Sequence, residues 1–474
     1  MLNYAHNINR FVSLVWIRRG ITFAVFLLLM LCIKNKFYMN DEYWFAISLD
    51  KGEYVFHNFH ILSNSIIYLI WSLITLLGIK ISAFYAAQLS SSILSAIGAA
   101  ALIDLGMFWG LSWRNAILFS LPILLCNAFI RYGTSAYPGA MAMGIGLVAI
   151  NLAVRAAACF EFNIPRTKSY IYYFCAGIFV GLAALMHLSF LVFFPGLLCG
   201  LVFLMLKQRG DGDKCTGNIT KTILFYCFGV FSLLITLYLF LPLISKAYPN
   251  QVTYTVAQEK GVLFSLLTKQ LPKWWPSFKE FVVCSKTFMA LFFPGVHSEN
   301  IILNFIFGIP RIFAFLVFIY LMNKAWKNRK SNVIVFYWGV ITLITGIFYF
   351  FFLLFSGIQQ CRQYAVVSLS VFGPFFLSVF ILSYDKNRYI KILINLFTVF
   401  LIFYSIFGIE GIVQIITHDN RPMLKLYSHC EVHVPKSVQF PWLVDRSAQD
   451  PLCHWEDRYG AFGPGLDYLS KDSK

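Results

Sequence analysis

Long runs of apolar residues follow one another along most of this chain. Crossing about 30 Å of hydrocarbon takes a helix of about 20 residues, and most of the runs approach that length. The runs are continuous rather than alternating, which indicates helices and not the strands of a membrane barrel. They lie near residues 20–38, 59–79, 81–108, 115–130, 137–154, 170–186, 188–206, 222–244, 303–323, 333–354, 364–383 and 392–410. The pattern predicts an all-α, polytopic membrane protein.

Composition agrees with this prediction. Hydrophobic residues make up 59% of the 474 positions and charged residues only 12%, whereas a soluble domain carries about 25% charged residues. The mean hydropathy is +0.70. A soluble enzyme, a disordered protein and a nucleic-acid-binding domain are therefore excluded. The net charge of +17 is explained by Lys and Arg in cytoplasmic loops, which fix membrane orientation.

The charge rule also decides whether the run at 59–79 crosses the membrane. If it does not cross, the inner loops and the N-terminal tail together hold 18 basic and 4 acidic residues. If it crosses, most of those basic clusters face outward, against the rule. Polar residues interrupt the run, among them His60, Asn64 and Ser72, as in a helix that lies at the membrane interface. We therefore expect about eleven transmembrane helices, with the N-terminus inside and the C-terminus outside.

This topology divides the chain into two parts. Residues 1–410 form a transmembrane domain with a first outer loop at 39–80 and a second at 245–302, and residues 411–474 form an outer C-terminal tail. The compartment expected outside is the periplasm of a bacterial inner membrane. Its oxidising conditions permit disulfides, and among the outward cysteines, Cys430 and Cys453 are the expected pair.

Acidic and histidine residues follow the first predicted span. Asp41 and Glu42 are adjacent carboxylates at a membrane surface. They are either solvated interfacial charges or a general base that takes the proton of an acceptor hydroxyl. His57 and His60 follow, three residues apart, so both can face one side of a helix. Such a pair can bind a metal or hydrogen-bond a phosphate or sugar, and we favour the second interpretation.

Two arginines lie in short outer connections that otherwise lack charge. Arg131 precedes Tyr137-Pro138, and Arg362 precedes Tyr364. Each can be an interfacial side chain that extends toward water or a bidentate ligand of a lipid phosphate. His187 lies in the turn between two later spans, and it is either a polar turn residue or part of a pocket.

The order of these features resembles the GT-C superfamily of integral-membrane glycosyltransferases, which use polyprenyl-phosphate sugars. Asp41-Glu42 is similar to the acidic motif of that family's first loop, and the segment from His57 to His60 is similar to its juxtamembrane helix. The resemblance covers about residues 10–390. Within it, the chain resembles the serotype-converting glucosyltransferases that modify bacterial lipopolysaccharide O-antigen.

The resemblance implies a donor, an acceptor and a set of site residues. A hexose such as glucose would pass from polyprenyl phosphate to a hydroxyl of a surface glycan, on the periplasmic face and next to membrane lipid. Asp41 would act as base with Glu42 orienting the acceptor or a metal, or the two roles would be exchanged. The expected ligands of the donor phosphate and sugar are His57, His60, Arg131, Tyr137, His187, Arg362 and Tyr364.

The same sequence features bear on metal dependence and on alternative functions. Many relatives carry an acidic residue where this chain has Ser135-Ala136-Tyr137, so a divalent metal is compatible with the site but not required. The sequence contains no P-loop, dinucleotide fingerprint or nucleophile elbow. A flippase or transporter of lipid-linked sugars is the first alternative, and an O-antigen polymerase or ligase is the second. The concentration of polar residues at the outer surface, rather than at mid-membrane, favours the transferase.

Overall fold

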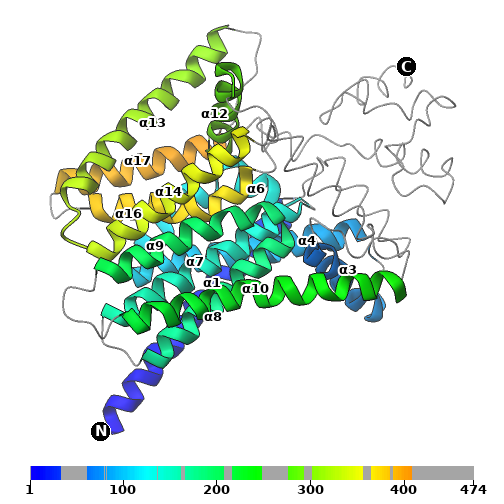
Figure 1. Ribbon diagram of the computed structural model, residues 1–474. Coiled ribbons are helices and arrows are strands. Elements are labelled where there is room, and N and C mark those ends of the chain that lie inside the picture. The colour runs from blue at the N-terminus through cyan, green and yellow to red at the C-terminus, as the bar shows by residue number, and fades with distance from the viewer. Residues whose placement is uncertain are drawn as a thin grey trace, which may run out of the picture.

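The computed structural model consists of helices and their connections (Figure 1), and contains no strand in the part of the chain that it describes. That part comprises residues 2–33, 61–79, 81, 83–135, 137–161, 166–207, 216–247, 276–292, 301–355, 365–384 and 388–407. The helices are α1 (Leu2–Cys32), α3 (Ile61–Leu76), α4 (Ala83–Phe108), α5 (Trp113–Leu124), α6 (Asn127–Gly133), α7 (Pro138–Glu161), α8 (Arg166–Met186), η1 (Leu188–Val192), α9 (Phe193–Lys207), α10 (Thr216–Ala247), α12 (Phe278–Phe292), α13 (Ile301–Lys327), α14 (Val333–Phe355), η3 (Val366–Ser368), α16 (Leu369–Ser383) and α17 (Arg388–Phe407).

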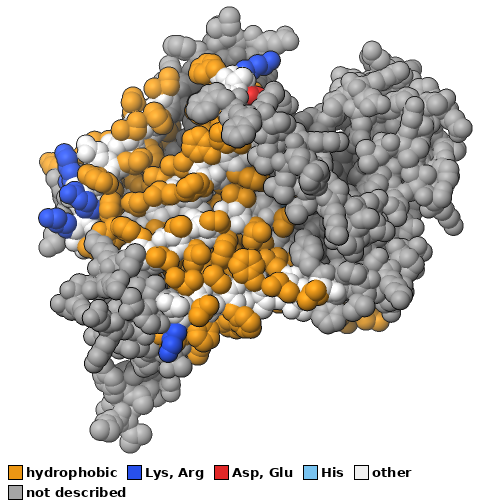
Figure 2. Space-filling view, in the orientation of Figure 1, with side chains coloured by type: hydrophobic (Ala, Val, Ile, Leu, Met, Phe, Trp, Pro, Cys, Tyr) orange, Lys and Arg blue, Asp and Glu red, His pale blue; other side chains and the backbone are white. Residues whose placement is uncertain are grey.

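Each apolar run in the sequence coincides with a helix or with two helices joined end to end. Among the described residues, 7 helical segments are long and apolar enough to cross a membrane: Val15–Cys32, Tyr85–Phe108, Pro138–Ala157, Ser169–Met186, Thr220–Leu237, Val333–Phe355 and Val366–Ser383. Apolar side chains cover a broad surface of the bundle (Figure 2). The chain is therefore a multi-pass, all-α membrane protein, as predicted; the number of eleven spans and their orientation remain predictions.

Helix α3 corresponds to the run that we expect not to cross. It has 16 residues, or about 24 Å at about 1.5 Å per residue, which is shorter than the hydrocarbon core. Ser63 and Asn64 are buried on it rather than exposed to solvent, and the helix packs on α4 and α8. These two polar residues thus face the bundle, and the interfacial position of α3 stays a prediction.

The run at 115–130 is a single continuous helix in the sequence pattern but two helices in the structure. Pro122 lies inside α5, which ends at Leu124, and α6 begins two residues beyond Leu125. Proline lacks a backbone N–H and disturbs the helical turn that precedes it, so the break after Leu124 lies beyond the turn that Pro122 weakens. The break produces the short helix α6, which carries Arg131.

Glycines allow the central helices to approach closely. A Cβ atom on Gly98 of α4 would lie 2.7 Å from the Gly144 Cα atom of α7. On α8, Gly177 and Gly181 are four residues apart and face α10, where a Cβ on Gly181 would lie 2.8 Å from the Val230 carbonyl oxygen. Small residues at this spacing let membrane helices pack backbone to backbone. The glycines therefore bring α4 close to α7 and α8 close to α10.

A buried charge cluster joins α1, α4 and α7. Asp104 on α4 accepts hydrogen bonds from Arg19 Nε at 2.9 Å and from Arg155 Nη2 at 2.6 Å. Asn151 links the cluster by donating to the Asp104 Oδ2 atom at 3.0 Å and accepting from Arg155 Nε at 2.7 Å. We call the end of the bundle that contains this cluster the basic end, and the opposite end the far end.

Candidate functional site

The turn between α6 and α7, at the far end, is held by polar side chains of α4. Gln88 donates to the Thr134 carbonyl oxygen at 3.2 Å, and Ser92 donates to the Gly133 carbonyl oxygen at 3.2 Å. Carbonyls at a helix C-terminus lack partners within the helix, and these α4 side chains supply them. The turn that carries Tyr137 is therefore fixed by a neighbouring helix.

Two residues next to helix ends meet at this turn. Tyr137 directly precedes Pro138, the first residue of α7, and a residue before proline favours extended backbone. His187 directly follows α8 and has extended backbone, with φ −152° and ψ 107°. Their side chains are 3% and 1% exposed. Both are thus core residues, placed by the ends of two helices that pack against each other.

Tyr137 and His187 belong to a buried chain of hydrogen bonds that we call the His187 network. The Tyr137 hydroxyl lies 2.9 Å from His187 Nε2, and the Ser189 hydroxyl lies 2.6 Å from His187 Nδ1. Tyr349 of α14 extends the chain by donating to the Ser189 oxygen at 3.0 Å. Because both ring nitrogens are engaged, the imidazole is fixed in orientation. The linked hydroxyls can pass a proton between the two tyrosines.

Arg131 lies beside one end of the network. Its guanidinium carbon is 5.9 Å from the centre of the Tyr132 ring, and the Tyr132 and Tyr137 rings are 5.6 Å apart. A cation within about 6 Å of an aromatic ring is attracted to the ring's electron density. The side chain is half-buried, which places a positive charge next to the turn. The aromatic pair thus connects Arg131 to Tyr137.

A later segment packs on the same turn. η3 lies against both α6 and α7, and Val366, Val367 and Ser368 within it are buried. Arg362 and Tyr364 are outside the described residues, a few positions before η3. Asp41, Glu42, His57, His60, Cys430 and Cys453 are also outside them. Their assigned roles remain predictions, as do those of Arg131, Tyr137 and His187.

The structure adds residues that the sequence did not identify as part of this site. Tyr349 is one of many aromatic residues on α14, and nothing in the sequence distinguishes it. Gln88 and Ser92 lie in the stretch Gln88–Ser92 of α4, where four of five residues are polar. This concentration was the signal in the sequence. Among the residues whose positions are described, no three His, Cys, Asp or Glu side chains come together as metal ligands.

Cys284, one of the cysteines expected outside, is a free thiol on α12. It is fully buried and contacts the Phe350 carbonyl oxygen at 3.8 Å. Burial raises the pKa of this thiol to about 12. Cys284 is thus a packing residue and is poorly placed for disulfide exchange.

Comparison with known proteins gives no family for this chain. No family model matches it, and no curated protein sequence matches it. Its function must therefore be argued from its own residues.

Proposed function

We propose that this protein is a membrane glycosyltransferase that moves a hexose from a polyprenyl-phosphate carrier to a hydroxyl group of a surface glycan such as lipopolysaccharide O-antigen. The main support is the buried junction of Tyr137 with His187 at 2.9 Å, next to the turn that carries Arg131. This junction combines hydrogen-bonding groups with a cation inside an apolar bundle. Such groups are costly within a membrane and mark functional sites.

The reaction is a direct displacement at the anomeric carbon of the sugar. The acceptor oxygen forms the new bond to that carbon as the bond to the phosphate oxygen breaks. Asp41 or Glu42 takes the hydroxyl proton, and polyprenyl phosphate leaves with the bonding electron pair. Arg131 and Arg362 stabilise the leaving phosphate, and electrostatic stabilisation of this kind is usually a large catalytic contribution. The His187 network fixes the Tyr137 ring, which packs against Tyr132 beside Arg131.

The decisive experiment measures transfer directly. The purified full-length protein in lipid nanodiscs is given synthetic polyprenyl-phosphate glucose and isolated O-antigen, and mass spectrometry detects an added hexose. Asp41→Asn and Glu42→Gln keep side-chain size while removing charge, and at least one should abolish transfer. Tyr226→Phe, a change in a buried tyrosine of α10, serves as the control. Full activity in both carboxylate variants would contradict the catalytic assignment.

The burial of the His187 network favours one second candidate, a proton-coupled flippase or transporter of lipid-linked sugars. Buried histidines linked to hydroxyls act as proton relays in such proteins. The two functions differ in whether a new glycosidic bond forms and in whether a pH gradient drives the process. A transporter would move labelled lipid-linked sugar across proteoliposomes without forming a new glycosidic bond and would respond to an imposed pH gradient. A transferase would form the bond with or without the gradient.

A further inference from the structure

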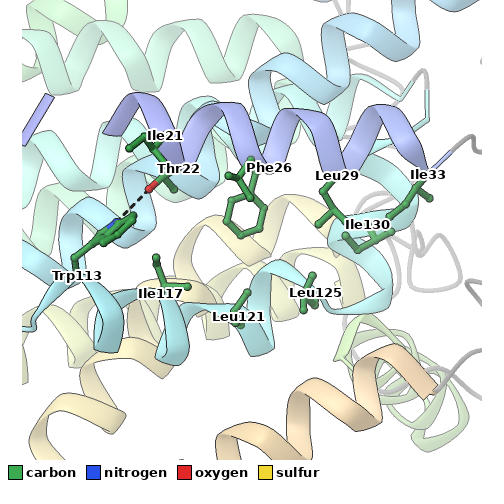
Figure 3. Close-up of a pocket in the computed structure, with 11 residues that line it drawn as sticks. Ile21, Thr22, Phe26, Leu29, Ile33, Trp113, Ile117, Leu121, Leu125 and Ile130 are labelled. Atoms are coloured by element: carbon green, nitrogen blue, oxygen red, sulfur yellow. Dashed lines mark hydrogen bonds between the residues drawn. The ribbon is translucent and has the colours of Figure 1, made fainter. Parts of the chain in front are cut away.

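A groove runs along α1 on the side that faces α5 (Figure 3). Its volume is about 520 Å³, and it is lined by side chains of α1, α5 and α6 together with Ile33 and Leu125, which lie just beyond the ends of α1 and α5. On α1 it extends from Ile21 to Ile33, which is about 18 Å at about 1.5 Å per residue. Both helices pack on α4, so the space between them remains open. Val25, which lines the groove, is 56% exposed, and the groove is therefore accessible from outside the bundle.

The lining can accept only hydrocarbon. Apart from Thr22 and the indole of Trp113, every lining residue is aliphatic or phenylalanine. The Thr22 hydroxyl accepts from Trp113 Nε1 at 3.4 Å (Figure 3). It also donates to the Arg18 carbonyl oxygen at 2.8 Å. The polar groups of the lining are thus paired with each other. A sugar or peptide would find no partners there, whereas an alkyl chain needs none.

One mouth of the groove carries positive charge. Arg18 precedes Ile21, Thr22 and Val25 by three, four and seven residues, so it lies on the same face of α1 as the groove. Arg114 precedes Ile117 and Leu121 by three and seven residues and lies on the matching face of α5. Both arginines are exposed, and neither takes part in an ion pair among the described residues.

The surrounding charge at this mouth is also positive. The nearby cluster contains two arginines, Arg19 and Arg155, and one carboxylate, Asp104, which leaves one net positive charge. Arginines in pockets between helices at a cytoplasmic face are suited to anionic lipid headgroups. Charge and groove therefore match the two parts of an anionic lipid.

We propose that this groove binds one acyl chain of an anionic phospholipid, with the headgroup phosphate between Arg18 and Arg114. The headgroup position is at the basic end, and the groove extends from it along α1 toward Ile130 of α6 at the far end. None of the residues that line the groove belongs to the His187 network. The lipid site does not depend on the proposed transfer reaction, because its ligand is a lipid of the surrounding membrane rather than a substrate.

Native mass spectrometry of the purified full-length protein tests this proposal. The probes are dioleoyl phosphatidylglycerol and dioleoyl phosphatidylcholine, which have the same chains. We expect one phosphatidylglycerol to remain bound, with a preference of about tenfold over phosphatidylcholine. Arg18→Gln combined with Arg114→Gln should remove the preference, and Val25→Phe should reduce binding of both lipids. Arg329→Gln combined with Lys330→Gln, a matched pair at the α13–α14 connection, should change neither.

Three results would overturn the proposal. The first is equal binding of both lipids by the unmodified protein, and the second is an unchanged preference in the double arginine variant. The third is displacement of phosphatidylglycerol by stoichiometric polyprenyl phosphate, which would assign the groove to the prenyl carrier. A second measurement does not depend on the folding of the arginine variants: brominated phosphatidylglycerol should quench the fluorescence of Trp113 more than brominated phosphatidylcholine does, as judged against Trp113→Phe. Equal quenching by both lipids would contradict the headgroup assignment.

Discussion

Arg155 Nη2 on α7 lies 2.6 Å from Asp104 Oδ2 on α4, although the two residues are 51 positions apart in the sequence. The same carboxylate also pairs with Arg19 of α1 at 2.9 Å. One carboxylate thus pairs with two guanidinium groups where an unpaired charge is costly. The relationship makes Asp104 the link between α1, α4 and α7.

Replacing Asp104 should destabilise the bundle more than replacing either arginine. Asp104→Asn leaves two guanidinium groups facing each other without a counter-charge. Removing one member of a buried pair costs about 3–5 kcal/mol, and we expect the lower value because the arginines are 26% and 21% exposed. Thermal unfolding in detergent measures the change. Asp104→Glu should keep most of the stability, and equal stability of Asn and Asp forms would show that the pairs contribute nothing.

Removing the Tyr137 hydroxyl should impair function far more than folding. Tyr137→Phe deletes the hydrogen bond to His187 Nε2, worth about 0.5–1.5 kcal/mol of stability. It loosens the His187 ring, which still contacts Ser189. We expect transfer activity to fall about tenfold or more with near-normal unfolding temperature. Tyr226→Phe is the matched control, because the buried Tyr226 hydroxyl has no hydrogen-bond partner among the described residues. Equal activity of the two variants would mean that the His187 network is only structural.

Alanine substitutions should destabilise the protein where a glycine touches a neighbouring helix and not where it faces open space. A Cβ on Gly144 would overlap the Leu94 carbonyl of α4, whereas a Cβ on Gly20 would meet nothing within 4 Å. Gly144→Ala should therefore force α4 and α7 apart and lower the unfolding temperature. Gly20→Ala should be neutral or stabilising by about 0.5–1 kcal/mol, since alanine favours the helix. Similar effects at both positions would contradict the packing.

Cys284 should resist alkylation in the folded protein. Its pKa is raised by burial from 9.0 to about 12, so at pH 8 the thiol stays protonated and the reactive thiolate is scarce. Maleimide should reach Cys284 only after denaturation. Because the unfolded chain loses this proton earlier, the thiol should lower stability as pH rises from 9 toward 12 and have no effect at neutral pH. Rapid labelling of Cys284 at pH 8 would show that α12 does not pack as described.

The predicted topology can be tested with reporter fusions. Fusions at Gly110, which lies between α4 and α5, should report the cytoplasm. Fusions at Thr134 and Ser470 should report the periplasm. A periplasmic signal at Gly110 would mean that α3 crosses the membrane and that the assigned orientation is wrong.

Positions of the helices were predictable from the sequence because membrane-spanning helices are selected by length and hydropathy, which are local properties. The break between α5 and α6 was not predicted, although Pro122 was visible, because proline often sits within membrane helices without ending them. Pro374 does so in α16. Local sequence therefore indicates where a helix is weakened but not where it ends.

The contacts within the candidate site could be identified only from the structure. Tyr137 and His187 were each noted because polar residues near helix ends are conspicuous in an apolar chain. Their contact spans 50 residues and depends on how α7 packs on α8. The pairing of Asp104 with Arg19, across 85 residues, likewise depends on the tertiary arrangement. No periodicity in the sequence encodes either contact.

The connection between α8 and α9 has a consequence for biosynthesis. His187 and η1 join the two helices with a turn in which Phe190 is fully buried, and Ser189 is hydrogen-bonded to His187 and Tyr349. The connection between α8 and α9 contains no long hydrophilic segment that could separate the membrane insertion of α8 from that of α9. We therefore expect α8 and α9 to leave the translocon as one helical hairpin, so that a charged insertion within 187–192 would block membrane integration of both helices.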